Sequence, residues 1–156
     1  MSKLSLRTEG DTGVVITRHF DAPPEDVFRA HVEPELLKEW CIGPDGWTMP
    51  VCINDARPGG AIRYEWTDGK GGGFHLTGEY VTVEAPHRLV HIERMHLPDP
   101  TPDNRVETTF TAERGGTLLT MRMTLPDAAT RAAMLATGMA DGMEMGYARL
   151  DRRWSK

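Results

Sequence analysis

A change of hydrophobic period divides residues 117–154, which read TLLTMRMTLPDAATRAAMLATGMADGMEMGYARLDRRW. In the first part, every second residue is apolar, as expected for a strand with one buried face: Leu119, Met121, Met123 and Leu125. After Pro126-Asp127, apolar or small residues recur at helical spacing: Ala132, Leu135, Met139, Met143, Gly146, Leu150 and Trp154. The stretch therefore predicts a strand followed by a C-terminal helix, with Asp127 as its N-cap.

The length of this helix depends on Thr137-Gly138. Unbroken to Arg153, the helix would be about 39 Å long, and seven strands would span about 34 Å, so it could cross a whole sheet. Glycine is a poor interior helix residue, and we therefore predict a break at Thr137-Gly138 into a short and a longer helix.

Upstream of residue 117, the period of two extends back to Trp47 and predicts an antiparallel meander with one buried face. A separate first strand is predicted at 13–20. The seven predicted strands are 13–20, 47–54, 62–66, 74–84, 88–96, 105–113 and 117–125. The phase slips near Tyr80-Val81, which predicts a bulge and a curved sheet. Residues 97–104 are rich in proline and aspartate and predict an exposed loop.

Two short helices are predicted between the first and second strands. Pro23-Pro24, followed by Glu25 and Asp26, is typical of a helix start, and Pro34 begins the second. The predicted fold class is thus α+β: a curved seven-stranded antiparallel sheet, two short helices and a long C-terminal helix.

Composition limits the possible functions. The 156 residues fit one domain, predicted over 1–156 with a core at 13–154. A net charge of −5 argues against a nucleic-acid partner. We find no secretion signal and no apolar stretch of membrane-spanning length, so a cytoplasmic location with no membrane partner is expected.

Several motifs, in order, give the chain a family resemblance. They are FDAPPEDVF (20–28), GPDGWTMPVC (43–52), RPGG (57–60), GEY (78–80) with RLVH (88–91), GGTLLTM (115–121) and GMADGME (138–144). Over about residues 13–154 the chain resembles the SRPBCC, or START-like, superfamily. The branch it most resembles is that of the homologues of the activator of the heat-shock chaperone ATPase.

The resemblance implies a helix-grip fold with a cavity between the C-terminal helix and the sheet. The superfamily includes lipid carriers, hormone receptors, polyketide aromatases and cyclases, and co-chaperones, so the fold leaves the function open. One departure concerns the pocket. Many relatives carry a Trp-Trp pair before Gly-Pro, whereas this chain has Trp40-Cys41-Ile42.

Large apolar side chains supply a candidate lining for such a cavity. The predicted ligand contacts are Trp40, Trp47, Tyr64, Trp66, Phe110, Met121, Met139 and Met143. Methionine suits adaptable pockets, and it equally fills gaps in ordinary cores. Gly138, Gly142 and Gly146 recur every four residues on one helical face. They either leave room for a ligand or admit close packing, with Gly138 ending a helix.

His91 and Glu93 are the candidate catalytic residues, because they project to the same side of one predicted strand. If that side faces the cavity, they could act as base and acid or hold the polar end of a ligand. The alternation in 88–96 does not choose the face, and a solvated or paired strand edge is the other interpretation.

Other chemistries are not indicated. The serines are Ser2, Ser5 and Ser155, which excludes a serine hydrolase. Cys41 could be a nucleophile or a small buried apolar residue. We find no metal-ligand spacing and no nucleotide-binding loop, so no metal and no cofactor are expected.

The favoured function is binding of a small hydrophobic molecule in the cavity. An aromatase- or cyclase-like enzyme using His91 and Glu93 is the alternative, so enzymatic activity stays open. A co-chaperone-like module with a chaperone partner ranks third. A homodimer is also compatible with the sequence.

Overall fold

A computed structural model describes residues 3–97 and 99–155 of the chain. Met1, Ser2 and Lys156, in the predicted domain 1–156, and Pro98, in the predicted loop 97–104, lie outside the described residues. The elements are β1 Ser5–Glu9, β2 Gly13–Phe20, α1 Pro24–Val32, α2 Pro34–Trp40, β3 Thr48–Asn54, β4 Ala61–Thr67, β5 Gly73–Glu84, β6 Arg88–His96, β7 Asn104–Glu113, β8 Gly116–Thr124, α3 Ala128–Leu135 and α4 Met139–Trp154.

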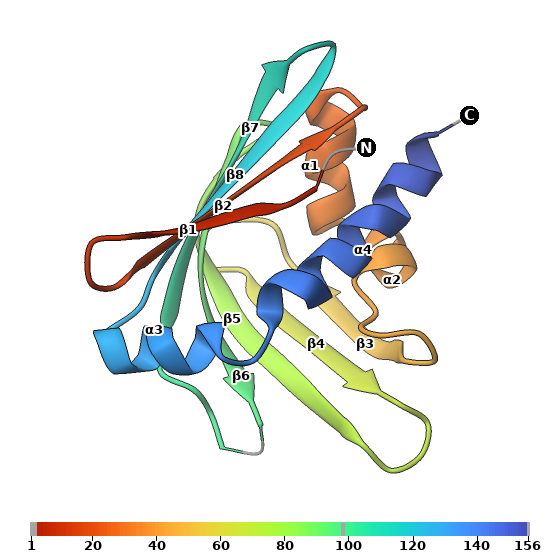
Figure 1. Cartoon of the computed structure of the whole chain (residues 1–156). Coiled ribbons are helices and arrows are strands. Elements are labelled where there is room, and N and C mark those ends of the chain that lie inside the picture. Colours follow the sequence, from red (N-terminus) through yellow and green to blue (C-terminus); the bar gives the residue numbers. More distant parts are fainter. Residues whose placement is uncertain (1–2, 98, 156) are drawn as a thin grey trace.

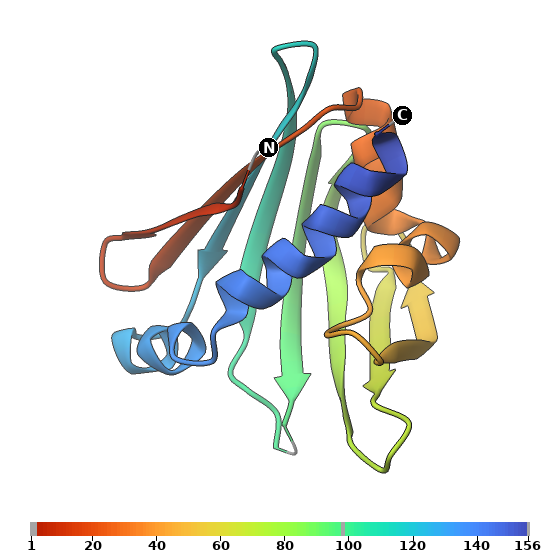
Figure 2. The same ribbon diagram turned by 45° about the vertical axis from the view of Figure 1, so that its right-hand side comes forward.

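The strands form one antiparallel sheet in the order β1-β2-β8-β7-β6-β5-β4-β3 (Figure 1). Helix α4 runs obliquely across this sheet, with α1 and α2 near its C-terminal end and α3 beyond its N-terminal end (Figure 2). This arrangement is consistent with the helix-grip fold expected from the sequence.

The predicted count of strands was wrong. The described residues contain eight strands, because β1 pairs with β2 from Ser5↔Thr17 to Glu9↔Gly13. Four of its five residues are exposed, so no buried face imposes alternation on its sequence. An edge strand of this kind is held by backbone pairing with its neighbour, which leaves little hydrophobic signal to read.

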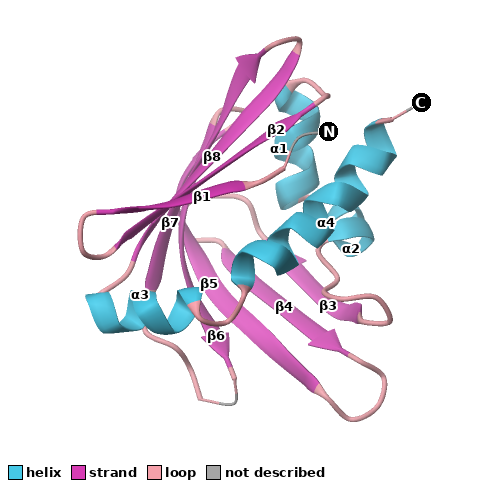
Figure 3. Cartoon of the chain, viewed as in Figure 1, coloured by secondary structure: helices cyan, strands magenta, loops and turns pink. Residues whose placement is uncertain are grey.

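The helices number four in the part of the chain that the structure describes, so two short helices and one long helix were an incomplete description. The predicted break at Thr137-Gly138 is confirmed and separates α3 from α4 (Figure 3). Gly138 precedes α4 with a φ of 76°, a left-handed conformation that glycine adopts without strain. The Asp127 side chain accepts a hydrogen bond from the Thr130 backbone N–H at 2.7 Å, which confirms the predicted N-cap.

Curvature arises at the predicted bulge, where the β5–β6 register shifts between Tyr80 and Thr82. The face of the sheet beneath the helices carries two apolar clusters. The larger lies under α1, α2 and the C-terminal half of α4 and includes Phe20, Phe28, Trp40, Phe110 and Tyr147. The smaller lies near α3 and includes Val14, Ile16, Val106, Met123 and Leu125.

An ion-pair network holds α4 on the sheet. Arg18 of β2 is 1% exposed and donates to both carboxylates that α4 turns toward it, Glu144 at 2.8 Å and Asp151 at 2.7 Å. Burial opposes the charge of Arg18, but these hydrogen bonds raise its pKa above the ordinary value. Glu144 also accepts from the Leu4 backbone N–H at 2.8 Å, so one side chain joins α4, β2 and the start of the chain.

Candidate ligand-binding face beneath helix α4

The helix-covered face of the sheet includes the His91 and Glu93 side chains. On β6, these residues alternate in phase with Leu89 and Met95, which pack in the larger apolar cluster. The His91 ring also meets the buried Tyr80 ring edge-on, with centroids 6.0 Å apart. His91 and Glu93 therefore face the helices. Their strand, β6, lies inside the sheet rather than at its edge.

His91 and Glu93 are joined by a hydrogen bond of 2.7 Å between Nε2 and Oε1. Their side chains are 17% and 22% exposed, so they are largely covered and still reach solvent. A histidine and a carboxylate in this geometry can orient each other, exchange a proton or hold the polar end of a bound molecule.

Asn104 of β7 adds a third polar group that the sequence analysis did not select. It is the cross-strand partner of Glu93 and is 7% exposed. Its Oδ1 is buried and has no hydrogen-bond partner among the residues that the structure describes. The sequence did contain a signal for it. Asn104 stands in the same alternation as Val106, Thr108 and Phe110, the buried positions of β7, so its side chain shares their face.

Tyr64 belongs to a hydrogen-bonded chain across β3, β4 and β5. Tyr80 donates to Asn54 Oδ1 at 2.9 Å, and Asn54 Nδ2 donates to the Tyr64 hydroxyl at 2.6 Å. Burial raises the pKa of Tyr80 to about 12 and that of Tyr64 well above its ordinary value. Both phenols are therefore neutral at physiological pH, and Tyr64 keeps its own proton available for donation.

Three aromatic rings lie together beside this chain. Phe74 stacks on Trp66 with centroids 4.9 Å apart and lies 5.5 Å from Trp47. Trp66 donates its Nε1–H to the Cys41 carbonyl at 2.7 Å, which joins the loop after α2 to the sheet.

The Cys41 thiol is a poor nucleophile in this setting. Burial raises its pKa to about 12, and the nearby Cys52 and Glu93 add to the shift. Because the thiolate is the reactive form, Cys41 behaves as a small, partly buried apolar residue at neutral pH.

The eight predicted contact residues divide into two groups. Trp40, Trp66 and Phe110 are buried, with 8%, 8% and 2% exposure. Trp40 is further fixed by a 2.8 Å hydrogen bond to the Ala30 carbonyl and by stacking on Tyr147. The other five, partly exposed to solvent, are Trp47, Tyr64, Met121, Met139 and Met143. Met121 and Met143 pack against both apolar clusters and so lie where the two meet.

The three helical glycines have different roles. A Cβ at Gly146 would lie 3.1 Å from both the Trp40 ring and the Trp40 carbonyl oxygen, so this glycine admits close packing. A Cβ at Gly142 would meet no atom within 4 Å. Gly138 separates the two helices. The three glycines therefore do not form one continuous space for a ligand, and at Gly146 the close-packing alternative holds.

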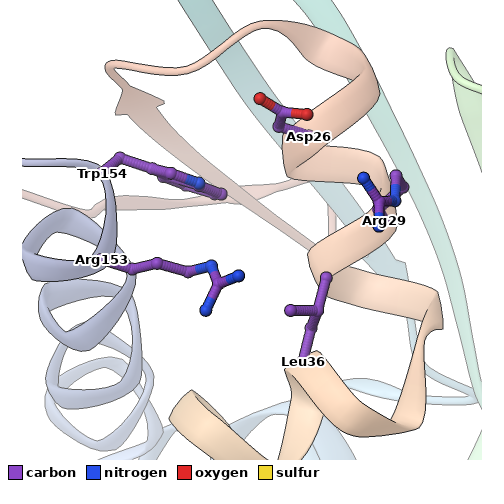
Figure 4. Close-up of a pocket in the computed structure, with 5 residues that line it drawn as sticks. All are labelled: Asp26, Arg29, Leu36, Arg153 and Trp154. Carbon is purple, nitrogen blue, oxygen red and sulfur yellow. The ribbon is translucent and has the colours of Figure 1, made fainter.

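Two surface pockets lie among the helices. One, of about 340 Å³, is lined by Asp26 and Arg29 of α1, Leu36 of α2, and Arg153 and Trp154 of α4, which lie across the pocket from the other three (Figure 4). The other, of about 520 Å³, lies between the end of α2 and α4. Of the eight predicted contacts, Trp40 alone lines either pocket, and neither is lined by a strand residue.

The residues that the structure describes contain no group of three or more histidine, cysteine, aspartate or glutamate side chains placed to hold a metal ion. Within 3–97 and 99–155, every helix is too short or too polar to span a membrane.

An antiparallel sheet holding a C-terminal helix, with two short helices after its second strand, defines the helix-grip class. Residues 21–154 match the family described as "Activator of Hsp90 ATPase homolog 1-like protein". The chain belongs to this family, within the SRPBCC superfamily.

Solved structures similar to the chain agree with this assignment. A Rhodobacter sphaeroides protein is 33% identical, with 97% of each chain covered and a TM-score of 0.90. A Mycobacterium smegmatis protein is 25% identical, with 99% of this chain and 98% of that chain covered and a TM-score of 0.87. A Nitrosomonas europaea protein is 23% identical, with 92% of this chain and 94% of that chain covered and a TM-score of 0.79. At this identity, the likeness supports the fold alone. No curated protein matched the chain.

Proposed function

We propose that the protein binds a small, largely apolar molecule between α4 and the helix-covered face of the sheet. One observation carries this proposal: Trp47, Tyr64, Met121, Met139 and Met143 stay partly exposed on elements that surround this face. Covering apolar surface contributes roughly 25 cal/mol per Å², so a ligand that shields these side chains gains affinity from them.

The position of the methionines supports the same site. Met121 of β8 and Met143 of α4 lie where the two apolar clusters meet. Methionine has three rotatable bonds and a polarizable sulfur, so these side chains can move to admit a ligand at low cost. Trp40, Trp66 and Phe110 are expected to form the rigid wall behind them, since they are already packed.

Substitution of Met143 tests the site. Met143→Trp places a larger side chain under α4 and is expected to lower the affinity for a neutral apolar dye, such as Nile red, about tenfold. Native mass spectrometry of the purified wild-type chain would reveal a retained molecule directly.

Met145→Trp is the matched control, because Met145 lies on the same helix and is 41% exposed. It should leave dye binding unchanged, with circular dichroism confirming that both variants fold. Equal binding by the Met143→Trp variant and the wild type, or no dye binding by the wild type, would remove the proposal.

An enzyme acting in the same place is the second candidate. It is favoured by the 2.7 Å bond between His91 and Glu93 on the helix-covered face. An aromatase- or cyclase-like reaction needs a positioned acid and base, and this pair supplies both. His91→Gln and Glu93→Gln would then abolish turnover while the fold is kept, and unchanged turnover would exclude this candidate.

A chaperone-binding role is the third candidate, and it rests on the family description, which names an activator of the Hsp90 ATPase. Such a role would use the outer surface. It predicts a complex with a purified chaperone that Met143→Trp does not weaken, and failure to form that complex would exclude it.

A further inference from the structure

Hydrogen-bond acceptors collect at one point of the helix-covered face. Glu93 of β6 and Asn104 of β7 are cross-strand partners, so their side chains leave the sheet on the same side and lie next to each other. His91 lies two residues before Glu93 and bonds to one of its carboxylate oxygens. The three groups define what we call the acceptor cluster: His91, Glu93 and Asn104.

Two acceptors in this cluster are unused. Within residues 3–97 and 99–155, the Glu93 carboxylate accepts a hydrogen bond from His91 through Oε1, and Oε2 is free to accept another. Asn104 Oδ1 is buried without a partner in the described part of the chain, on a residue only 7% exposed. A buried carbonyl without a donor costs free energy in the unliganded protein, and a ligand that donates to it recovers that cost.

The electrostatic surroundings favour a donor of positive charge. In the described residues, the ion pairs of Glu93 include no lysine or arginine. Arg18, the buried cation on this side of the sheet, is already bound by Glu144 and Asp151. Among the described residues, Glu93 therefore has no permanently charged partner, and large apolar side chains flank the cluster, among them Met95 and Tyr80.

We propose that the ligand carries a hydrogen-bond-donating head group, specifically a protonated amine, bound by Glu93 Oε2 and Asn104 Oδ1, with its apolar body against Met121 and Met143. This assignment rests on the proposed binding function and names the class of ligand. An ammonium group donates up to three hydrogen bonds and accepts none, which matches two open acceptors. A carboxylate or phosphate head would meet the Glu93 charge and be rejected.

A matched series of ten-carbon ligands tests the proposal by calorimetric titration, with Nile red as the neutral apolar probe. Decylamine is expected to bind the wild type about tenfold more tightly than decanol, with decanoate weakest. Glu93→Gln should lower decylamine affinity about tenfold and reduce the discrimination against decanoate. Asn104→Leu should lower the affinity for both amine and alcohol, while thermal stability stays the same or rises because an unpaired buried carbonyl is removed.

Glu79→Gln is the control, because Glu79 lies on the opposite face of β5 and pairs with Arg94. It should leave the order of affinities unchanged. If Nile red binds but decanoate binds as tightly as decylamine, or the two site variants bind like the wild type, the amine assignment is wrong and the binding function stands. If neither the dye nor any member of the series binds, both proposals are overturned.

Discussion

At the scale of single residues, His31 shows how the tertiary environment changes an ordinary side chain. It lies on α1 against Trp40 and Phe110, with ring centroids 5.0 and 5.3 Å away. Nδ1 donates to the Val27 carbonyl at 2.7 Å, and Nε2 is buried with no hydrogen-bond partner among the described residues. Burial lowers the pKa of His31 to about 4, partly offset by the bond to Val27.

This shift predicts a loss of stability in mild acid. The unfolded chain takes up a proton on His31 below pH 6.5, but the folded chain does not do so until about pH 4. The stabilisation, at most about 3 kcal/mol, is therefore fully present above pH 6.5 and is lost as the pH falls toward 4. Urea unfolding between pH 4.5 and 6.5 should give a flatter pH dependence for His31→Leu than for the wild type.

His87→Gln is the matched control, since His87 is exposed in the turn before β6. It should retain the wild-type slope. Identical slopes for the wild type and His31→Leu would contradict the burial of a neutral imidazole. Carboxylates with lowered pKa values, such as Glu144, add a slope at the acid end of this range, but they do so equally in the wild type and in His31→Leu, so the difference between the two reports His31.

At the scale of elements, α4 contains two glycines with opposite surroundings. Gly142 faces open space, whereas a Cβ at Gly146 would press on the Trp40 ring and carbonyl. That carbonyl also accepts from Arg149 at 3.1 Å, so it cannot move away freely. Gly142→Ala should stabilise the protein by about 0.5–1 kcal/mol through helix propensity.

Gly146→Ala, with the same change of propensity, should instead destabilise the protein by about 1 kcal/mol or more, because overpacking outweighs the gain. Thermal unfolding of the Gly142→Ala and Gly146→Ala variants measures both changes in stability and shows whether they have opposite signs. A stabilised Gly146→Ala variant would mean that α4 does not pack on Trp40 as described. Sequence spacing placed both glycines on one face but could not distinguish them, because the residue that packs against Gly146 alone, Trp40, comes from the distant α2.

At the scale of the whole molecule, the two apolar clusters differ in how firmly they are held. The larger contains most of the buried side chains and is connected to α4 by Tyr147 and Leu150. Helix α3 has no buried residue and contributes to the smaller cluster through partly buried Met134 and Leu135. Amide hydrogen exchange should therefore be faster in α3 than in the C-terminal half of α4. Equal protection would show that α3 is held as firmly as α4.

The sequence by itself determined the α+β class, seven of the eight strands, the bulge near Tyr80 and the helix break at Gly138. These features follow from local periodicity, turn residues and capping, which act over a few neighbouring positions. It also indicated His91 and Glu93 as a pair, because alternate strand residues share a face. The exposed β1 left no such pattern.

Only the tertiary structure decided which side that pair faces and what lies beside it. Asn104 reaches Glu93 through the β6–β7 register, and Arg18 meets Glu144 and Asp151 more than 120 residues away along the chain. The same holds for Gly146 and Trp40. These relations depend on strand register and helix placement, which follow from packing of the whole chain rather than from the residues nearby in sequence.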